Sequence, residues 1–244
     1  TNYVYSDYRR ELDVYRGVLH TRLKKVPLCG PAHASNFGWL TNFLNDARSD
    51  VVLASRHHYP MSADPSFKPD NPRYTSLENL LSAATMKASA KLIREHQQAS
   101  SKLGVPLRVG ETNTASRGGK AGVSDSFASA LWVLDYLFVL ARFGAAGANL
   151  QTGINHLGLL SSYSPITDDR KGRYGAAPEY YGLLAFAQIA EGELIAADVS
   201  KGGVNLSAHA VRQEDGAIGV AVINKDMTRD AAVRIAGGSQ GDAQ

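Results

Sequence analysis

VPLRVGETNTASRGG, residues 105–119, is an apolar run that ends in a single carboxylate, Glu111, and continues as a polar loop closed by glycines. Apolar runs of the same kind occur at 26–32, 50–60 and 147–153. Helical patterns alternate with these runs, at 36–46, 76–103, 123–144 and 178–190. Segments of this length are too long for hairpin turns, so the sequence predicts parallel βα units.

Four βα units fit either an open doubly wound sheet or part of a closed eight-stranded barrel. The open sheet predicts a glycine-rich phosphate loop after its first strand, and GPAHASNFG at 30–38 lacks the G-x-G-x-x-G spacing. In a barrel, polar side chains at the carboxyl ends of the strands converge on the active site. Each predicted strand ends in such residues, namely His33, then His57, His58 and Tyr59, then Glu111 and Asn113, then Gln151 and Thr152. The sequence therefore favours an α/β barrel, of which four strands are visible.

The pattern changes after about residue 192. Short alternating or β-branched runs follow one another there, separated by Gly, Asp and Lys, at 194–200, 204–212, 217–225 and 231–237. No helical pattern lies between them. The sequence predicts antiparallel strands of a second, β-rich domain.

Composition narrows the class of protein. The 244 residues carry a net charge of +3 with scattered Lys and Arg, which argues against a nucleic-acid partner. The one cysteine, Cys29, excludes a disulfide within the chain, and zinc and haem spacings are absent. The longest apolar stretch is interrupted by Asp135 and Arg142, which predicts a buried helix rather than a membrane span. Charges and tyrosines occupy the first residues, where a signal peptide needs an apolar core.

A carboxylate at a barrel strand end serves as a nucleophile, a general base or a metal ligand. Metal binding is the weaker interpretation, because no second acid ends a neighbouring strand and adjacent residues His57 and His58 point to opposite sides of an extended strand. A glutamate nucleophile fits glycoside hydrolysis, in which a second carboxylic acid protonates the leaving oxygen. Tyr59 would then donate a hydrogen bond that keeps Glu111 ionised. The alternative is that Glu111 is an ordinary exposed loop acid.

Residues 110–153 resemble the nucleophile region of the heparanase-like β-glucuronidases, glycoside hydrolase family 79. The shared features are GETNTA followed by glycines, then SDSFA and WVLD. SRHHYP at 55–60 resembles the end of that family's sixth barrel strand, and YGAAPEYYGLLAF at 174–186 its final barrel helix. The resemblance runs from about Pro31 to Glu193. It implies the C-terminal half, strands 5–8, of a retaining (β/α)8 barrel at 1–191, followed by part of a β-sandwich domain at 192–244.

The resemblance also implies roles for individual residues. Glu111 is expected to be the nucleophile and Tyr59 its hydrogen-bond partner. The expected substrate-binding residues are His57, Asn113, Arg117, Gly118, Gly119, Gln151, Thr152 and Tyr163. Ser116 and Arg117 depart from the family pattern, and Arg117 would either contact a uronate or remain a solvated charge. Structural alternatives remain for His57 as a core histidine, for Gln151 as a strand-end cap, and for Gly118 and Gly119 as turn glycines.

The family's acid/base residue is the glutamate of an Asn-Glu-Pro motif, and none of the eight glutamates in this chain follows an asparagine. The first residues resemble the segment just downstream of that motif. We therefore expect the chain to be the C-terminal portion of a longer enzyme, inactive alone and partnered by the missing N-terminal part. No cofactor is expected, and the resemblance favours a secreted or periplasmic location. The alternatives are a neutral-sugar retaining hydrolase of the same clan and a non-catalytic carbohydrate-binding or scaffold protein.

Overall fold

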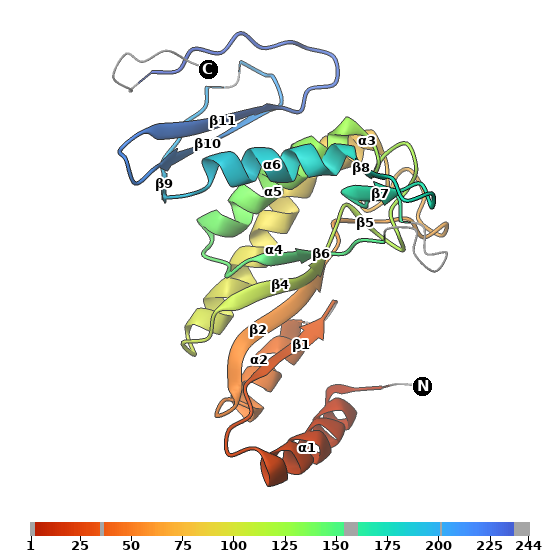
Figure 1. Ribbon diagram of the computed structural model, residues 1–244, viewed down its shortest axis with the longest axis vertical. Helices are drawn as coiled ribbons and strands as arrows, with labels where there is room; N and C mark the ends of the chain where they lie inside the picture. The colour runs from red at the N-terminus through yellow and green to blue at the C-terminus, as the bar shows by residue number, and fades with distance from the viewer. Residues whose placement is uncertain (1–2, 35–36, 154–160, 201, 237–244) are drawn as a thin grey trace. The chain divides into compact units, whose positions relative to one another are not determined.

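The four predicted barrel strands form one parallel sheet, in the order in which they occur in the chain. They are β1 (Leu28–His33), β2 (Val51–His58), β4 (Leu107–Thr112) and β6 (Ala148–Leu150) (Figure 1). A doubly wound sheet reverses its strand order at a switch point, whereas a barrel adds each strand beside the one before. The order β1-β2-β4-β6 contains no reversal, so these strands are arranged as in a barrel.

This computed structural model describes residues 3–34, 37–153, 161–200 and 202–236. Its contacts divide the chain into two units. The first unit is Thr1–His58, Ala90–Thr112 and Phe143–Leu150, and it holds the parallel sheet. The second unit is Tyr59–Ser89, Asn113–Arg142 and Gln151–Gln244. The domain boundary predicted at 191/192 stays a prediction.

Helix α2 (Phe37–Asp46) covers the sheet of the first unit. Its apolar residues recur at helical spacing, and Leu40, Phe43 and Leu44 are all buried. They share a core with sheet residues such as Ala54 and Leu107. Partly buried side chains of α1 (Tyr5–Arg22) pack against the same core.

The helix predicted over 76–103 is two helices, α3 (Leu77–Leu81) and α4 (Ala83–Ser101). Ser76 caps α3 as predicted, since its Oγ accepts a hydrogen bond from the backbone N–H of Asn79 (3.2 Å). Ser82 interrupts the pattern, because its extended backbone (ψ 141°) ends α3 and its Oγ accepts from the N–H of Thr85 (3.1 Å). Ser82, inside an apolar pattern, therefore caps the start of α4.

Two helices and an antiparallel sheet build the core of the second unit. They are α5 (Phe127–Arg142), α6 (Pro178–Ile189), β9 (Glu193–Ile195), β10 (Leu206–Arg212) and β11 (Ile218–Asn224). Phe138 of α5 packs there with Val211 and Ala221 of the sheet. Pro178 begins α6 as predicted. In the described part of the chain, no helix is long and apolar enough to cross a membrane.

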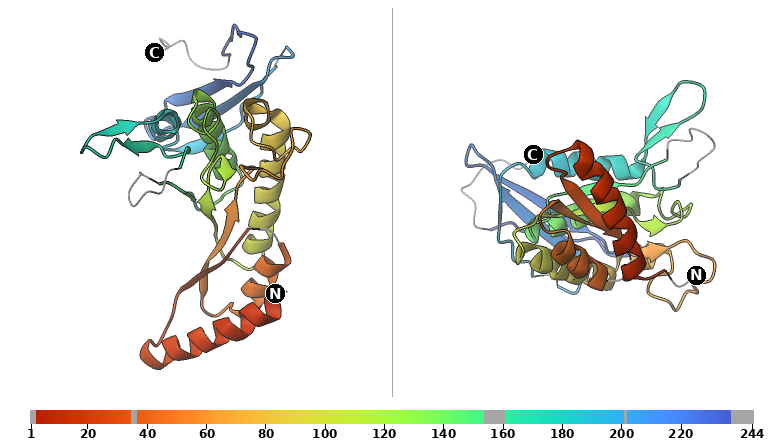
Figure 2. Two further views of the ribbon diagram at one scale, coloured as in Figure 1. Left: turned by 90° about the vertical axis from the view of Figure 1, so that its right-hand side faces the viewer. Right: turned by 90° about the horizontal axis from the view of Figure 1, so that it is seen from below.

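Other predictions for the second unit were wrong in detail. Neither Ser124 nor Asp125 caps α5. Oγ of Ser124 accepts a hydrogen bond from the backbone N–H of Lys120 (3.0 Å). The carboxylate of Asp125 accepts one from the backbone N–H of Gly122 (2.6 Å). Residues 231–236 of the predicted last strand form no strand. The sequence pattern also missed four short strands, which are β3 (Met61–Ser62), β5 (Ala115–Ser116), β7 (Ile166–Asp168) and β8 (Tyr174–Ala176). Figure 2 shows β7 and β8 as a hairpin.

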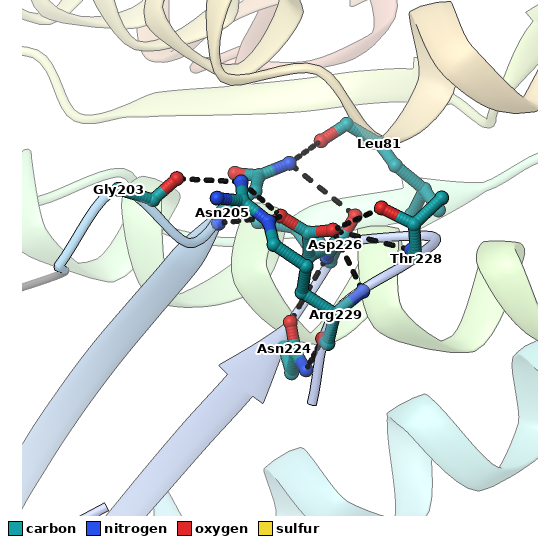
Figure 3. Close-up of polar contacts among 8 residues, drawn as sticks. Leu81, Gly203, Asn205, Asn224, Asp226, Thr228 and Arg229 are labelled. Carbon is teal, nitrogen blue, oxygen red and sulfur yellow. Dashed lines mark hydrogen bonds and ion pairs between the residues drawn. The ribbon is translucent and has the colours of Figure 1, made fainter. Parts of the chain in front are cut away.

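A polar cluster holds the chain after β11 against the segment before β10 (Figure 3). The carboxylate of Asp226 accepts from Nε (3.0 Å) and Nη2 (2.6 Å) of Arg229, which in turn donates to the backbone oxygen of Gly203 (2.6 Å). Nδ2 of Asn205 donates to the backbone oxygen of Leu81 (2.9 Å). The hydrogen bonds from Arg229 lower the pKa of Asp226, so the Asp226 carboxylate is negatively charged at neutral pH. It ties the antiparallel sheet to the end of α3.

Candidate active site

Glu111 and His57 lie side by side at the carboxyl ends of two adjacent strands in the first unit. The register of β2 and β4 pairs His57 with Glu111, and Nδ1 of His57 lies 3.4 Å from Oε2 of Glu111. The glutamate side chain is 35% exposed and the histidine side chain 27%. The carboxylate is therefore accessible from solvent and has a nitrogen partner. The sequence predicted that strand-end side chains converge, but it named Tyr59, not His57, as the partner of Glu111.

His58 has the opposite environment. It is 8% exposed, whereas its neighbour His57 faces Glu111. Oγ1 of Thr112 donates to the backbone oxygen of His58 (2.6 Å), which locks the last residues of β2 and β4 together. His58 is thus buried, as the core-histidine alternative expects, whereas the substrate-binding role expected of His57 stays a prediction.

Buried Arg56 supports the end of β2. Its guanidinium donates to the backbone oxygens of His57 (2.9 Å) and Ala34 (3.0 Å) and to Nε2 of His96 (2.5 Å). Burial and the nearby charge of Arg56 lower the pKa of His96 to about 4. His96 is therefore neutral at pH 7, with Nδ1–H donating to the backbone oxygen of Leu92 (2.7 Å). Sequence reasoning missed both residues, since neither an arginine inside a strand pattern nor a histidine inside a helical pattern carries a signal for such a contact.

The ring of Tyr59 stacks on that of Tyr163 in the second unit, with centroids 6.4 Å apart. Tyr163 is 4% exposed. Tyr59 belongs to the second unit and Glu111 to the first, so their expected hydrogen bond stays a prediction. The expected contact between Tyr163 and a substrate carboxylate also stays a prediction.

Asn113 connects several segments of the second unit. It is fully buried, and its Nδ2 lies within hydrogen-bond distance of the backbone oxygens of Gln151 (3.0 Å) and Tyr163 (3.3 Å) and of Oε2 of Glu179 (3.3 Å). Its Oδ1 accepts from the N–H of Thr114 (2.7 Å). These contacts order the chain after β4, after β6 and before β7. A direct contact between Asn113 and a sugar stays a prediction.

Three successive residues, Arg117, Gly118 and Gly119, have positive φ angles of 66°, 84° and 77°. A Cβ on Gly119 would lie 2.9 Å from the ring of Tyr163 and within 3 Å of Ser124, so only glycine fits there. The backbone oxygen of Gly118 accepts from the N–H of Ser162 (2.7 Å). The turn alternative therefore accounts for both glycines, and their expected contact with a sugar is untested.

The remaining predicted residues are exposed. Arg117 donates to the carboxylate of Asp64 (2.6 Å), an ion pair that neither sequence interpretation included. Gln151 and Thr152 follow β6 without regular structure, and both are exposed. Their predicted place under a sugar is untested.

A pocket of about 550 Å³ lies beside Gly119 in the second unit. Nζ of Lys120 lies in its lining, 3.1 Å from the hydroxyl of Tyr74, 3.0 Å from the backbone oxygen of Thr75 and 4.4 Å from the centre of the Tyr74 ring. No motif marks Lys120 in the sequence, although it directly follows the glycine pair. Among the described residues, no group of three His, Cys, Asp or Glu side chains could hold a metal ion.

The sequence is similar to those of two curated fungal proteins, while no family model matches it. One is a β-glucuronidase from Neurospora crassa, 29% identical over 147 residues, which cover 59% of this chain and 24% of that protein. The other is a β-glucuronidase from Aspergillus niger, 25% identical over 203 residues, which cover 78% and 36%. The chain thus spans about a quarter to a third of the length of these relatives.

Solved structures of glycosidases share the fold. A 4-O-α-L-rhamnosyl-β-D-glucuronidase from Fusarium oxysporum has a TM-score of 0.70 and 20% identity, over 94% of this chain and 47% of that one. A family 51 arabinofuranosidase from Xanthomonas axonopodis has a TM-score of 0.67 and 15% identity, over 93% and 50%. The chain therefore has the fold of part of a glycosidase (β/α)8 barrel followed by a β-sheet domain.

Proposed function

We propose that this chain is part of a retaining β-glucuronidase of glycoside hydrolase family 79, with Glu111 as the nucleophile. The observation that carries the proposal is the exposed Glu111 carboxylate at the end of β4, 3.4 Å from His57. Active sites of such barrels lie at the carboxyl ends of the strands. The two fungal relatives favour a glucuronide over a neutral sugar.

In this mechanism, a carboxylate oxygen of Glu111 attacks the anomeric carbon, and the bond to the leaving oxygen breaks as a second carboxylic acid protonates it. Water then hydrolyses the glycosyl ester and releases Glu111. An imidazole N–H of His57 would donate to the carboxylate and orient it. The proposed role of Tyr59 as a further donor, and the sugar contacts of the other predicted residues, rest on the family resemblance.

The proposal requires an acid/base carboxyl about 5 Å from the nucleophile. We assign this group to an N-terminal part of the same enzyme, which would be the partner of this chain. Residues 1–244 alone should then show no hydrolysis of an aryl β-glucuronide above the background rate. Measurable turnover by the purified chain would overturn this assignment.

Glu111→Gln tests the nucleophile in the protein that also carries the preceding strands. The amide keeps the shape of the side chain but is not nucleophilic, so hydrolysis of an aryl β-glucuronide should fall at least ~10³-fold. Binding of glucuronic acid should change little. Glu95→Gln, an exposed position on α4, is the control and should retain the wild-type rate. Retained turnover in Glu111→Gln would show that another residue is the nucleophile.

Covalent trapping identifies the attacking atom independently. A 2-deoxy-2-fluoro-glucuronide with a good leaving group slows release of the glycosyl ester more than its formation. After proteolysis, mass spectrometry should find the sugar mass on the peptide that contains Glu111. A label on a different carboxylate would contradict the proposal.

The choice of sugar is tested with matched aryl substrates. The glucuronide should be hydrolysed faster than the glucoside, the xyloside and the arabinofuranoside. Faster hydrolysis of a neutral substrate would favour the neutral-sugar alternative. Binding of sugars without turnover of any substrate, by the protein that carries all eight strands, would favour a non-catalytic role.

A further inference from the structure

Glu179 is a buried carboxyl group that the mechanism above does not use. It is the second residue of α6, after Pro178, and it is 1% exposed. Its Oε2 lies 3.3 Å from Nδ2 of Asn113. Its Oε1 is buried and has no hydrogen-bond partner in the described part of the chain. Burying a carboxyl group with one unsatisfied oxygen lowers the stability of the fold. Such a group in a native structure therefore calls for an explanation.

Asn113, the hydrogen-bond partner of Glu179, lies close in sequence to the proposed nucleophile. Asn113 comes two residues after Glu111, and its amide also reaches the backbone oxygens of Gln151 and Tyr163. An amide group has only two N–H hydrogens, so three acceptors share them. The position of the Glu179 carboxyl therefore affects how firmly Asn113 holds the segments that carry Gln151 and Tyr163.

We propose that Glu179 is a positioning residue for the glycosidase reaction, acting through Asn113 as a neutral carboxylic acid. The inference rests on the proposed function. In the neutral state, the carboxyl is a moderate acceptor that leaves the amide bonded to both backbone oxygens. Ionisation would strengthen its pull on Nδ2 of Asn113 and weaken the bonds to Gln151 and Tyr163.

The surroundings of Glu179 favour the neutral form. Burial raises its pKa to about 8, and the hydrogen bond from Asn113, which acts in the opposite direction, is the only other contribution. No charged side chain of the described residues therefore offsets the cost of ionisation. Because the folded pKa lies above the ordinary value of 4.5, the neutral form stabilises the fold fully below pH 4.5. This stability is lost as the pH rises from 4.5 to about 8.

NMR of the 244-residue chain tests the coupling without any activity. The side-chain amide signals of Asn113, assigned by their absence in Asn113→Ala, should shift with a midpoint near pH 8. Glu179→Gln should abolish this shift. Glu191→Gln removes an exposed acid just after the same helix and should leave it unchanged. An Asn113 signal that does not titrate, or that titrates equally in Glu179→Gln, would overturn the coupling.

A thermal unfolding series on the same chain checks the protonation state. Between pH 4.5 and 8, the unfolding midpoint of the wild type should fall relative to that of Glu179→Gln, because only the wild type must take up a proton at this position in order to fold. A constant difference between the two proteins across this window would mean that Glu179 is ionised throughout and would contradict the proposal.

Kinetics of the protein that also carries the preceding strands tests the positioning role. The ratio of kcat in Glu179→Gln to kcat in the wild type should rise about tenfold from pH 7 to pH 9, with KM little changed. Glu179→Ala should lower kcat at pH 6 about tenfold or more, and Glu179→Gln should restore it.

If Glu111→Gln abolishes turnover but both Glu179 variants behave as wild type, the inference fails and the proposed function stands. If the wild type hydrolyses no glucuronide, the proposed function fails and the positioning role with it, whereas the NMR titration still decides the Glu179–Asn113 coupling.

Discussion

Glu111 and Asn113 are two residues apart, yet one is accessible to solvent and the other is fully buried. Residues i and i+2 share a face only while the strand continues. β4 ends at Thr112, so the chain is free to turn after it and to place the Asn113 amide among backbone oxygens. The end of one strand thus separates an exposed carboxylate from a buried amide that contacts three other segments.

Gly119 allows a sharp test of the loop after β4. Gly119 and Gly122 have the same φ of 77°, but a Cβ would clash with Ser124 and Tyr163 only at Gly119. Gly122→Ala should therefore cost only the left-handed backbone strain, about 1–2 kcal/mol. Gly119→Ala should cost about 1–3 kcal/mol more because of overpacking. Urea denaturation of both variants measures the difference, and equal losses of unfolding free energy would show that the packing around Gly119 is looser than described.

At the scale of elements, α5 and α6 depend on a glycine for their close packing. A Cβ on Gly182 of α6 would meet the backbone oxygen of Ala130 and Cγ1 of Val133, both on α5. Backbone atoms cannot move aside as a flexible side chain can, so the helices would have to separate. Gly182→Ala should destabilise the protein by about 2 kcal/mol, although alanine is the better helix former.

Gly17 provides a control of opposite sign. It lies in α1, and a Cβ there would meet no atom within 4 Å. Gly17→Ala should therefore stabilise the protein by about 0.5–1 kcal/mol through helix propensity alone. Thermal unfolding of both variants gives the comparison. A destabilised Gly17→Ala, or a neutral Gly182→Ala, would contradict this account of the packing.

Local patterns predicted the elements whose signals lie within one segment. The apolar spacing of Leu40, Phe43 and Leu44 predicted α2, and Pro178 marked the start of α6. The sequence pattern did not predict the break at Ser82 or the hairpin of β7 and β8, because a single cap and three-residue strands show no periodicity.

The candidate site shows the same limit. A carboxylate at a strand end marked Glu111, but Glu179 has the appearance of an ordinary acid in the first turn of a helix, where exposed carboxylates are common. Only the three-dimensional contacts show that Glu179 is buried against Asn113, which is 66 residues away in sequence.

At the scale of the whole molecule, one buried charge connects helix α5 to the antiparallel sheet within the second unit. Asp135 of α5 is 2% exposed; its Oδ1 lies 2.7 Å from Nε2 of His209, and its Oδ2 pairs with Nζ of Lys225. Burial raises the pKa of Asp135, but the hydrogen bond from His209 and the charge of Lys225 outweigh this effect and lower it. Asp135 is therefore an anion whose partners lie 74 and 90 residues further along the chain, a distance that no sequence pattern bridges.

Asp135→Asn should consequently destabilise the sheet and the helices together. It leaves the Lys225 ammonium buried without its counter-ion, which costs about 3–5 kcal/mol. Adding Lys225→Met to Asp135→Asn removes the unpaired charge and should recover most of the loss, whereas the exposed Asp230→Asn should have no effect. Hydrogen exchange should show equal losses of protection in α5, β10 and β11, because Phe138, Val211 and Ala221 form one core. Loss of protection in the sheet alone would mean that residues 192–244 unfold independently, as the domain boundary predicted from the sequence would allow.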